Sequence, residues 1–345
     1  MEFLGNKTAL LPALRAVIAA RAAPGAVVAD AFAGTASVSA ALRADGYAVR
    51  ANDLLPLCAT WARARLLAPE RPAFAGLRPV LGELGPDPYA RVVSHLSGLA
   101  PVDGWVARHY APESRERESV ERRYLTVANA RVVDAIRGAV REWRPLLTEA
   151  ERALLLSTLV AAVVRVSNVA GTYGCYLKEW KPRALRPLAL VPVRPGPGPA
   201  DGHRVTCLDA ERAVAETDAE LVYADPPYTK RQYAAYYHLL NTLVGDEDPP
   251  LTGTTGLPPW QRWASDWCHA RRAPAALDRL VAKSAAPVLV LSYSSDGHIA
   301  HETVLDVLTA HGGVDVMEIE RRRYKSSRLA HRAPTVVERV YVLRR

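Results

Sequence analysis

The strand–helix–strand unit near the start of the chain is the feature that most constrains its fold. The apolar run AVVADAF (26–32) predicts a buried strand, and AVRAND (48–53) predicts a second one. Between them, TASVSAALRADG (35–46) has the spacing of a helix that stops at Gly46. Two strands joined by one helix are parallel, and such a crossover is right-handed. The chain therefore requires an open parallel sheet with helices packed on its faces.

The second half of the chain continues the same pattern. Short apolar runs predict further strands at residues 203–209, 219–225, 286–294, 314–322 and 335–343. A helix is expected over 298–312, and the last two strands are close enough in sequence to pair as an antiparallel hairpin. We predict a doubly wound, Rossmann-like α/β sheet that is mostly parallel and ends in an antiparallel C-terminal hairpin.

Between the two sets of strands the character of the sequence changes. Residues 57–156 mix prolines, amphipathic helices and Arg/Glu-rich stretches, with little strand signal. In SRERESVERRY (114–124) acids alternate with arginines, which favours a solvated helix face. We expect a mostly helical inserted domain over 57–156, and one catalytic domain formed by 1–56 and 157–345.

Composition limits the class of protein. The 345-residue chain is 49% hydrophobic but has no apolar run of about 18 residues, so no membrane span is expected. The four separated cysteines lack CxxC spacing and indicate reduced thiols, with no metal site. The N-terminus lacks a basic stretch before an apolar core, which argues against a secretory signal. We expect a cytoplasmic monomer.

The formal net charge of +8 permits a polyanionic partner such as a nucleic acid. Arginine greatly outnumbers lysine, but the whole chain is rich in Ala, Arg and Pro, so the excess carries little weight. A basic protein with no particular partner is the alternative.

Candidate ligand-binding residues follow the predicted strands at their carboxyl ends, where open α/β sheets bind ligands. Asp30, Phe32 and Gly34 follow the first strand, and the small Gly34 lets a ligand approach the backbone. Asp53 ends the second strand, where an acid can take two ribose hydroxyls, and Asp209 ends a third, where it can accept a hydrogen bond from an exocyclic amine.

The turn after the first strand discriminates between nucleotide cofactors. An NAD site requires GxGxxG to hold a pyrophosphate, and this turn contains only Gly34. A nucleoside cofactor without phosphates, such as S-adenosylmethionine, fits the turn better. An ordinary strand–helix turn, with Asp30 as a cap and Phe32 in the core, is the alternative.

The stretch Asp225-Pro226-Pro227-Tyr228 directly follows an apolar run. Proline fixes φ at about −65° and lacks an N–H, while its carbonyl still accepts hydrogen bonds. A carboxylate and a proline carbonyl can together accept both hydrogens of a planar amino group, and Tyr228 offers a face for stacking. The stretch therefore suits the exocyclic amine of a flipped-out base. A surface turn is the alternative.

The same stretch predicts a reaction. Hydrogen bonds from both amine hydrogens would localise the lone pair of the nitrogen, which then attacks a methyl group on a sulfonium. Positioning and electrostatics carry such a transfer, and no strong base is needed before the attack.

Three further segments combine basic and aromatic residues. TKRQYAAYYHLL (229–240) and SNVAGTYGCYLKEWKPR (167–183) suit loops or helices beside a nucleic acid, or core packing as the alternative. Residues 321–325, at the predicted hairpin tip, suit a DNA clamp or a solvated turn.

A resemblance to a known family rests on six stretches in chain order: FLGNK (3–7), DAFAGTASV (30–38), ND (52–53), ADPPYTKRQYAAYYHLL (224–240), LSYSSDG (291–297) and RRYKS (322–326). In them the chain resembles the D12-class, Dam-like adenine-N6 DNA methyltransferases. DPPY also occurs in RNA methyltransferases, but an FxGxK motif at the extreme N-terminus is more specific to the D12 group. The family often has Pro where Ala31 stands and Gly where Ala36 stands.

The resemblance implies a site-specific enzyme that moves a methyl group from S-adenosylmethionine to N6 of a flipped-out adenine in double-stranded DNA, leaving S-adenosylhomocysteine. It implies that Asp225, Pro226, Pro227 and Tyr228 hold the adenine. The cofactor site that it implies consists of Phe3, Gly5, Lys7, Asp30, Phe32, Gly34, Asp53 and Asp209. It also implies that a loop and helix lie beside the base pocket, with Arg231 near a DNA phosphate. From their basic or aromatic character, further candidate DNA contacts are Lys230, Tyr233, Tyr324 and Lys325.

The inserted segment would be the target-recognition domain of such an enzyme, with a cognate restriction endonuclease as a further expected partner and the bacterial nucleoid as its location. Two other enzymatic functions stay open: methylation of adenine in RNA and of cytosine N4 in DNA. A DNA-binding module that has lost catalysis is the third alternative.

Overall fold

The computed structural model describes residues 7, 10–322 and 335–345. They form two compact units. We call the first the sheet unit: Lys7–Leu54, Gly202–Gln232 and Ser265–Arg345. The second, the helical unit, has Leu55–Asp201 and Tyr233–Ala264 as its described residues.

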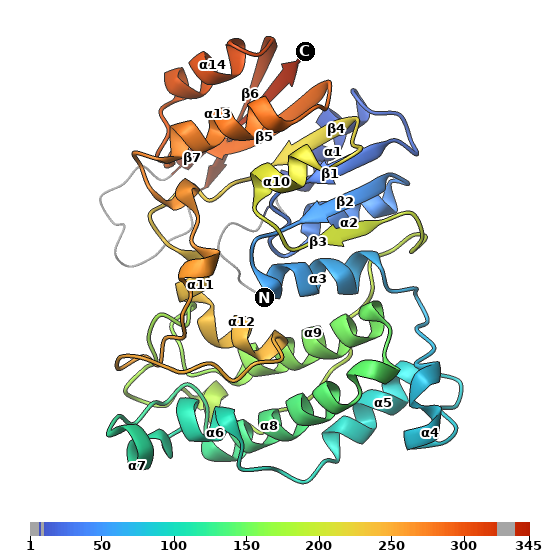
Figure 1. The fold of residues 1–345 in the computed structure, drawn as a ribbon, viewed down its shortest axis with the longest axis vertical. Coiled ribbons are helices and arrows are strands. Elements are labelled where there is room, and N and C mark those ends of the chain that lie inside the picture. The colour runs from blue at the N-terminus through green and yellow to red at the C-terminus, as the bar shows by residue number, and fades with distance from the viewer. Residues whose placement is uncertain (1–6, 8–9, 323–334) are drawn as a thin grey trace. The chain divides into compact units, whose positions relative to one another are not determined.

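The sheet unit contains a seven-stranded sheet with the order β3-β2-β1-β4-β5-β7-β6 (Figure 1). The strands are β1 (Val27–Asp30), β2 (Ala48–Asn52), β3 (Arg204–Thr206), β4 (Leu221–Ala224), β5 (Val288–Ser294), β6 (Gly313–Arg322) and β7 (Thr335–Arg344). All pairs from β3 to β5 are parallel, whereas β7 runs antiparallel to both β5 and β6. The predicted mostly parallel sheet with an antiparallel C-terminal pair is therefore confirmed.

The topology places a switch point between β1 and β4. From β1 the chain passes through α2 (Ser37–Ala44) to β2 on one side, whereas β4 pairs with β1 on the other side. Asp30 is in register with Tyr223, two residues before Asp225. Ligands of open α/β sheets bind outside the carboxyl ends of the strands at such a switch point. The candidate residues after β1 and β4 therefore share one edge of the sheet.

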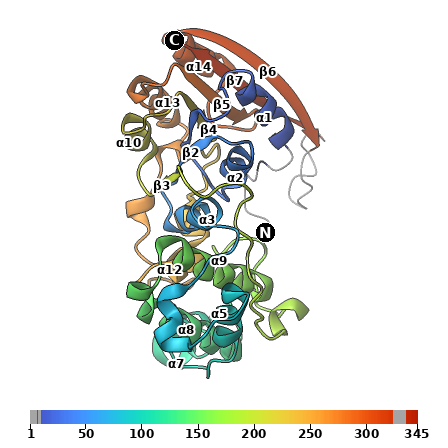
Figure 2. The ribbon, with the colours of Figure 1, turned by 90° about the vertical axis from the view of Figure 1, so that its right-hand side faces the viewer.

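Side chains alternate between the two faces of the sheet, as the period of a strand requires. One face buries Ala29, Val222, Leu289 and Leu291 against α10 (Ala210–Ala215), α13 (Ala273–Lys283) and α14 (His301–Thr309). Helices α1 (Leu11–Ala19) and α2 lie on the opposite face (Figure 2). The buried residues on the α1/α2 face include several polar ones, and these form the site described below.

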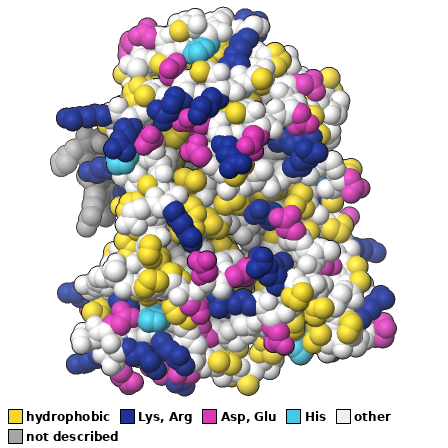
Figure 3. All heavy atoms as spheres, in the orientation of Figure 1, with side chains coloured by type: hydrophobic (Ala, Val, Ile, Leu, Met, Phe, Trp, Pro, Cys, Tyr) yellow, Lys and Arg dark blue, Asp and Glu magenta, His cyan; other side chains and the backbone are white. Residues whose placement is uncertain are grey.

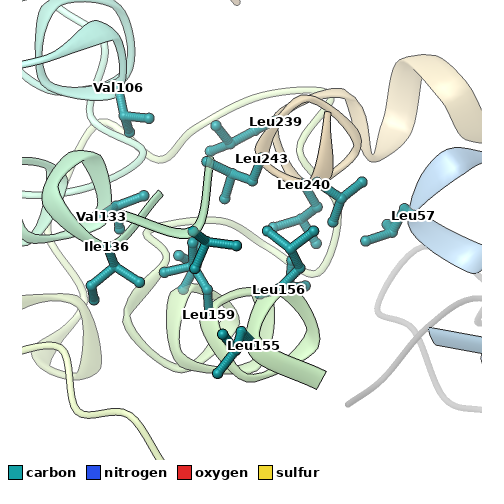
Figure 4. Close-up of a cluster of buried hydrophobic side chains, with 14 of the residues drawn as sticks. Leu57, Val106, Val133, Ile136, Leu155, Leu156, Leu159, Leu239, Leu240 and Leu243 are labelled. Atoms are coloured by element: carbon teal, nitrogen blue, oxygen red, sulfur yellow. The ribbon is translucent and has the colours of Figure 1, made fainter. Parts of the chain in front are cut away.

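The helical unit packs around a separate apolar core (Figure 4), in which Leu57, Leu156 and Leu240 come from distant parts of the chain. Its α-helices are α3 (Pro56–Leu66), α4 (Arg78–Leu81), α5 (Pro88–Ser97), α6 (Trp105–Tyr110), α7 (Ser114–Glu118), α8 (Val127–Glu142), α9 (Glu149–Val166), α11 (Tyr233–Tyr236) and α12 (His238–Val244). A capping box between Thr148 and Glu151 fixes the start of α9. Helix α12 follows the DPPY stretch in sequence but packs against α3 and α9.

Short 3-10 helices complete the two units. They are η2 (Ala75–Leu77), η3 (Arg144–Leu146), η4 (Pro182–Leu185), η5 (Gln261–Trp263) and η6 (Asp266–Cys268). Within the described ranges, no helix combines the length and the apolar character needed to cross a membrane.

Charges of both signs are interspersed on the surface (Figure 3). Many are paired, as in Arg212–Glu216 at 2.6 Å and Arg272–Asp266 at 3.3 Å. Exposed pairs of this kind each stabilise a fold by only about 0–1 kcal/mol. The SRERESVERRY segment follows its prediction at Arg115, which is exposed, but the prediction is wrong for Arg122, which is only 1% exposed.

Candidate active site

The turn after β1 has an unusual backbone. Gly34 has φ +53°, and Ala36, which immediately precedes α2, has φ +55°. A left-handed conformation costs a non-glycine residue about 1–2 kcal/mol. The side chain of Asp53 helps to hold the turn, because its Oδ2 accepts the Gly34 N–H at 2.8 Å. The predicted pair of Gly34 and Asp53 is thus brought into direct contact.

Asn52 holds the ends of three neighbouring strands together. Its Nδ2 donates to the carbonyls of Ala31, at 3.2 Å, and Leu208, at 3.1 Å. Its Oδ1 accepts from Thr206 Oγ1, at 2.8 Å, and from the Leu208 N–H, at 3.0 Å. The side chain is buried and its amide makes four hydrogen bonds, so Asn52 fixes the backbone from which Asp53 projects.

Asp30 lies under the turn, buried at 1% exposure. Its Oδ2 accepts from Ser39 Oγ of α2 at 2.6 Å, and its Oδ1 has no hydrogen-bond partner among the described residues. Burial raises the pKa of Asp30 to about 7; the Ser39 bond opposes this shift, and the nearby Asp53 adds to it. A buried oxygen without a donor is the kind of group that a bound ligand satisfies.

Asp225 immediately follows β4, so the strand fixes its position. Its Oδ1 lies 3.1 Å from Lys7 Nζ. The ammonium of Lys7 also bonds Glu338 of β7, and it lies 5.5 Å from the centroid of the Tyr228 ring. The side chains of Lys7, Asp225 and Glu338 are 4%, 13% and 3% exposed, so this cation between two carboxylates is almost completely shielded from solvent.

The same burial decides the charge states. Burial raises the pKa of Asp225 to about 7; the Lys7 ammonium opposes the shift, and Glu338 and Asp30 add to it. For Lys7, burial alone would lower the pKa, but Asp225 and Glu338 outweigh it and raise the pKa above its ordinary value. Lys7 is therefore an ammonium throughout the neutral range, whereas Asp225 changes its charge near neutrality.

Aromatic rings support the rim of the site. Tyr228 meets Tyr293 edge to face at 6.3 Å between ring centroids, and its carbonyl accepts the His298 N–H at 3.1 Å. A Cβ at Gly297 would lie 2.3 Å from the Tyr293 ring, so only glycine lets the loop after β5 pass. Phe32 meets Trp267 edge to face at 5.5 Å. The LSYSSDG stretch thus acts as a support for Tyr228.

The other predicted residues are placed as follows. Pro226 is buried and Pro227 half-buried, while Lys230 and Arg231 are exposed. Contrary to the prediction, Asp209 does not end a strand, because β3 stops at Thr206. It is exposed and caps α10, its side chain accepting the Glu211 N–H at 2.9 Å. Tyr233 begins α11 in the helical unit. Phe3, Gly5, Tyr324 and Lys325 lie outside the described residues.

Sequence reasoning missed three residues of the site: Asn52, whose role the ND motif did not reveal, Ser292 and Glu338. Ser292 Oγ donates to Glu338 Oε1 at 2.9 Å. The available signal was a charged residue within an apolar strand, because Glu338 lies on the same face of β7 as Val340 and Val342. That pattern marks an inward-facing acid, but not its partner.

The chain is similar to a known protein family over most of its length. Residues 3–66 and 105–276 match the family described as D12 class N6 adenine-specific DNA methyltransferase. The chain is 32% identical to the modification methylase StsI of Streptococcus sanguinis over 336 residues, which are 96% of this chain and 50% of that protein.

Two further relatives are also methyltransferases. Identity to the type II methyltransferase M.FokI of Planomicrobium okeanokoites is 31% over 339 residues, 96% of this chain and 50% of the relative. Identity to M.NlaIII of Neisseria lactamica is 31% over 257 residues, 73% of this chain and 75% of the relative. The chain spans about half the length of StsI and M.FokI.

Proposed function

This chain belongs to the family of D12 class N6 adenine-specific DNA methyltransferases, and on that premise we propose that it methylates adenine N6 at a specific sequence in double-stranded DNA. The methyl donor is S-adenosylmethionine. The observation that carries the proposal is Asp225, held at the switch-point edge by β4 and Lys7, beside the turn that follows β1.

The residues after β1 and β2 suit this cofactor. Gly34 would let the backbone come close to a ligand, Asp53 after β2 would bind ribose hydroxyls, and Phe32 would supply an apolar wall. The buried Oδ1 of Asp30 offers an acceptor to a donor group on the ligand or to a water beside it. When bound, S-adenosylmethionine supplies an electrophilic methyl group on a sulfonium.

Asp225 and the prolines would hold the target amine. Lys7 engages Asp225 Oδ1, which leaves Oδ2 to accept one N6 hydrogen, and the Pro226 carbonyl would accept the other. Tyr228, supported by Tyr293, would stack on the flipped-out base. The amine becomes cationic as it is methylated, and Asp225, with its pKa raised to about 7, is suited to take the proton that it releases.

The helical unit would supply target recognition, and the exposed Lys230 and Arg231 would contact the DNA backbone beside the base pocket. Tyr233, Tyr324 and Lys325 are proposed as further DNA contacts. A monomer acting with a cognate restriction endonuclease in the bacterial cytoplasm is the proposed setting.

The test is to incubate the protein with labelled S-adenosylmethionine and duplex DNA, with RNA in a parallel reaction, and to identify the labelled nucleoside. N6-methyladenine is the expected product. Asp225→Ala should lower its rate of formation at least about 100-fold, because it removes a polar contact made to the developing charge. Label found only in RNA, or only in N4-methylcytosine, would overturn the proposal.

A matched control separates this role from general damage. Asp209→Ala removes a carboxylate that caps α10 at the surface. If Asp209 also binds the cofactor amine, as the resemblance implies, this variant should raise KM for S-adenosylmethionine while kcat falls far less than in Asp225→Ala. Equal losses of kcat in the two variants would count against a special role for Asp225.

A further inference from the structure

Buried polar side chains cross the sheet next to Asp225. Ala224 is in register with Leu291, so Asp225 continues β4 beside Ser292 of β5. On the other side of β5, where β7 is its neighbour, Ser294 of β5 pairs with Glu338 of β7. All three of Ser292, Ser294 and Glu338 are buried. A polar row in the middle of a sheet costs free energy unless its members are paired, so their partners matter.

Glu338 is bound from two sides. Its Oε1 accepts the Ser292 hydroxyl at 2.9 Å and also bonds the Lys7 ammonium, which in turn reaches Asp225 Oδ1 at 3.1 Å. This leaves two carboxylates around one ammonium. One carboxylate would suffice to neutralise Lys7, and a second buried one adds desolvation cost and repulsion. Charge balance within the fold therefore does not account for Glu338.

We propose that Glu338 is a positioning residue for methyl transfer: it holds the Lys7 ammonium against Asp225 Oδ1, so that Oδ2 faces the target amine. This inference rests on the proposed function. A lysine side chain has several rotatable bonds, and one carboxylate alone would not fix its head group. The second carboxylate, itself held by Ser292, supplies the missing constraint.

The charge of Glu338 also acts on Asp225. Among the residues that the structure describes, the charged and titratable groups that face Asp225 are Lys7, Glu338 of β7, Asp30 of β1 and Tyr223 of β4. Glu338 is one of the two carboxylates that raise the pKa of Asp225. Without that charge the repulsion is lost, while the Lys7 ammonium keeps Asp225 as its remaining partner of the two carboxylates. The pKa of Asp225 should therefore fall, which a purely packing role would not cause.

The test compares Glu338→Gln with Glu318→Gln. Glutamine keeps the shape of Glu338 and can still accept from Ser292, but it lacks the charge. Glu318 is an exposed acid of the neighbouring strand β6, 56% exposed, and serves as the control. For Glu338→Gln, kcat should fall about 10- to 100-fold through misplacement of Asp225.

The pH profile supplies a second readout. The acid limb of kcat should move to lower pH in Glu338→Gln, and Glu338→Asp, which keeps the charge, should return it toward the wild-type position without restoring kcat. A Glu338→Gln enzyme with wild-type kcat and an unmoved acid limb would overturn the inference.

A measurement without substrate separates this inference from the proposed function. The Asp225 carboxyl can be titrated by carbon NMR in protein labelled at aspartate, with Asp225→Asn assigning the signal. Its titration should shift to lower pH in Glu338→Gln and stay unchanged in Glu318→Gln. If wild-type protein methylates no DNA but the titration shifts, the proposed function fails while the coupling stands; an unshifted titration overturns the coupling itself.

Discussion

The two units each contain a buried polar cluster, and the two clusters differ in what their buried groups can do. In the sheet unit, Lys7, Asp225 and Glu338 form a charged cluster in which Asp225, at 13%, is the most exposed of the three side chains. In the helical unit, a second cluster holds the turn 253–256. Its members are Tyr110, Arg122, Tyr124 and His238.

In the cluster of the helical unit, side chains donate hydrogen bonds to backbone carbonyls. Arg122 donates to the carbonyls of Gly253, at 3.0 Å, and Thr254, at 3.1 Å. Tyr124 bonds the next carbonyl, that of Thr255, and Tyr110 bonds that of Gly256, at 2.9 and 2.6 Å. Four successive carbonyls are thus held from inside the unit, which fixes the shape of an exposed turn.

Burial has opposite consequences in the two clusters. In the helical unit it lowers the pKa of His238 to about 4, so the histidine stays neutral near pH 7. In the sheet unit it raises the pKa of Asp225 to about 7, so this group changes charge there. The low dielectric therefore keeps His238 from titrating near pH 7 in one cluster and moves the titration of Asp225 close to pH 7 in the other. The first is suited to rigidity and the second to proton transfer.

The largest effect is expected from Arg122→Met. The substitution removes the Arg122 donors from the carbonyls of Gly253 and Thr254 and from Oε2 of Glu118. Removing one partner of such a buried network costs about 3–5 kcal/mol. The free energy of unfolding, from urea titration followed by circular dichroism, measures it.

Arg115→Met, in the same segment but with a side chain that is 75% exposed, is the control and should cost less than about 1 kcal/mol. A loss no larger than the control's would mean that the turn is held by its own Thr252–Leu257 backbone bonds and not by the cluster.

A smaller effect, visible in its pH dependence, is expected from Asp30→Asn. Because the folded protein raises the pKa of Asp30 to about 7, it binds this proton more tightly than the unfolded chain does. The stabilisation is complete below the unfolded pKa, near 4, and is lost as the pH rises through about 7. The wild-type Tm should therefore fall over that range, and Asp30→Asn should reduce the fall.

The exposed Asp306 on α14 supplies the control, since Asp306→Asn should leave the pH dependence of Tm unchanged. Parallel curves for wild type and Asp30→Asn would show that Asp30 ionises normally, and the contrast between the two clusters would then rest on Asp225 alone.

The smallest effect is expected at Ala36. In the turn 253–256 of the helical unit, the positions with positive φ are Gly253 and Gly256. In the turn after β1 of the sheet unit, Ala36 has φ +55°. Ala36→Gly should therefore increase the free energy of unfolding by about 0.5–1 kcal/mol, because relief of the left-handed strain exceeds the entropy cost of glycine.

Ala40→Gly, within α2, is the matched control and should instead destabilise by about 1 kcal/mol. Equal losses in the two variants would show that Ala36 is not strained, and denaturation by urea distinguishes the outcomes.

Much of the sheet was predictable because its signals are local. All seven strands fall within the predicted runs to within a residue or so at most ends, since apolar β-rich runs bounded by turn residues are contiguous in sequence. Helices α10 and α13 were not predicted, and the buried Arg122 was placed on a solvated face. In these cases the packing partner lies far away in the chain and leaves no local signal.

Three features of the sheet unit are specified by neighbouring residues and could be predicted: the parallel sheet, the glycine-poor turn after β1, and an acid followed by two prolines at the end of β4. The contact of Glu338 with Lys7, 331 positions away in the chain and beside Asp225, arises only when the strands assemble. Strand order sets that contact: β7 enters the sheet next to β5, and nothing in the local pattern of either strand specifies the neighbour.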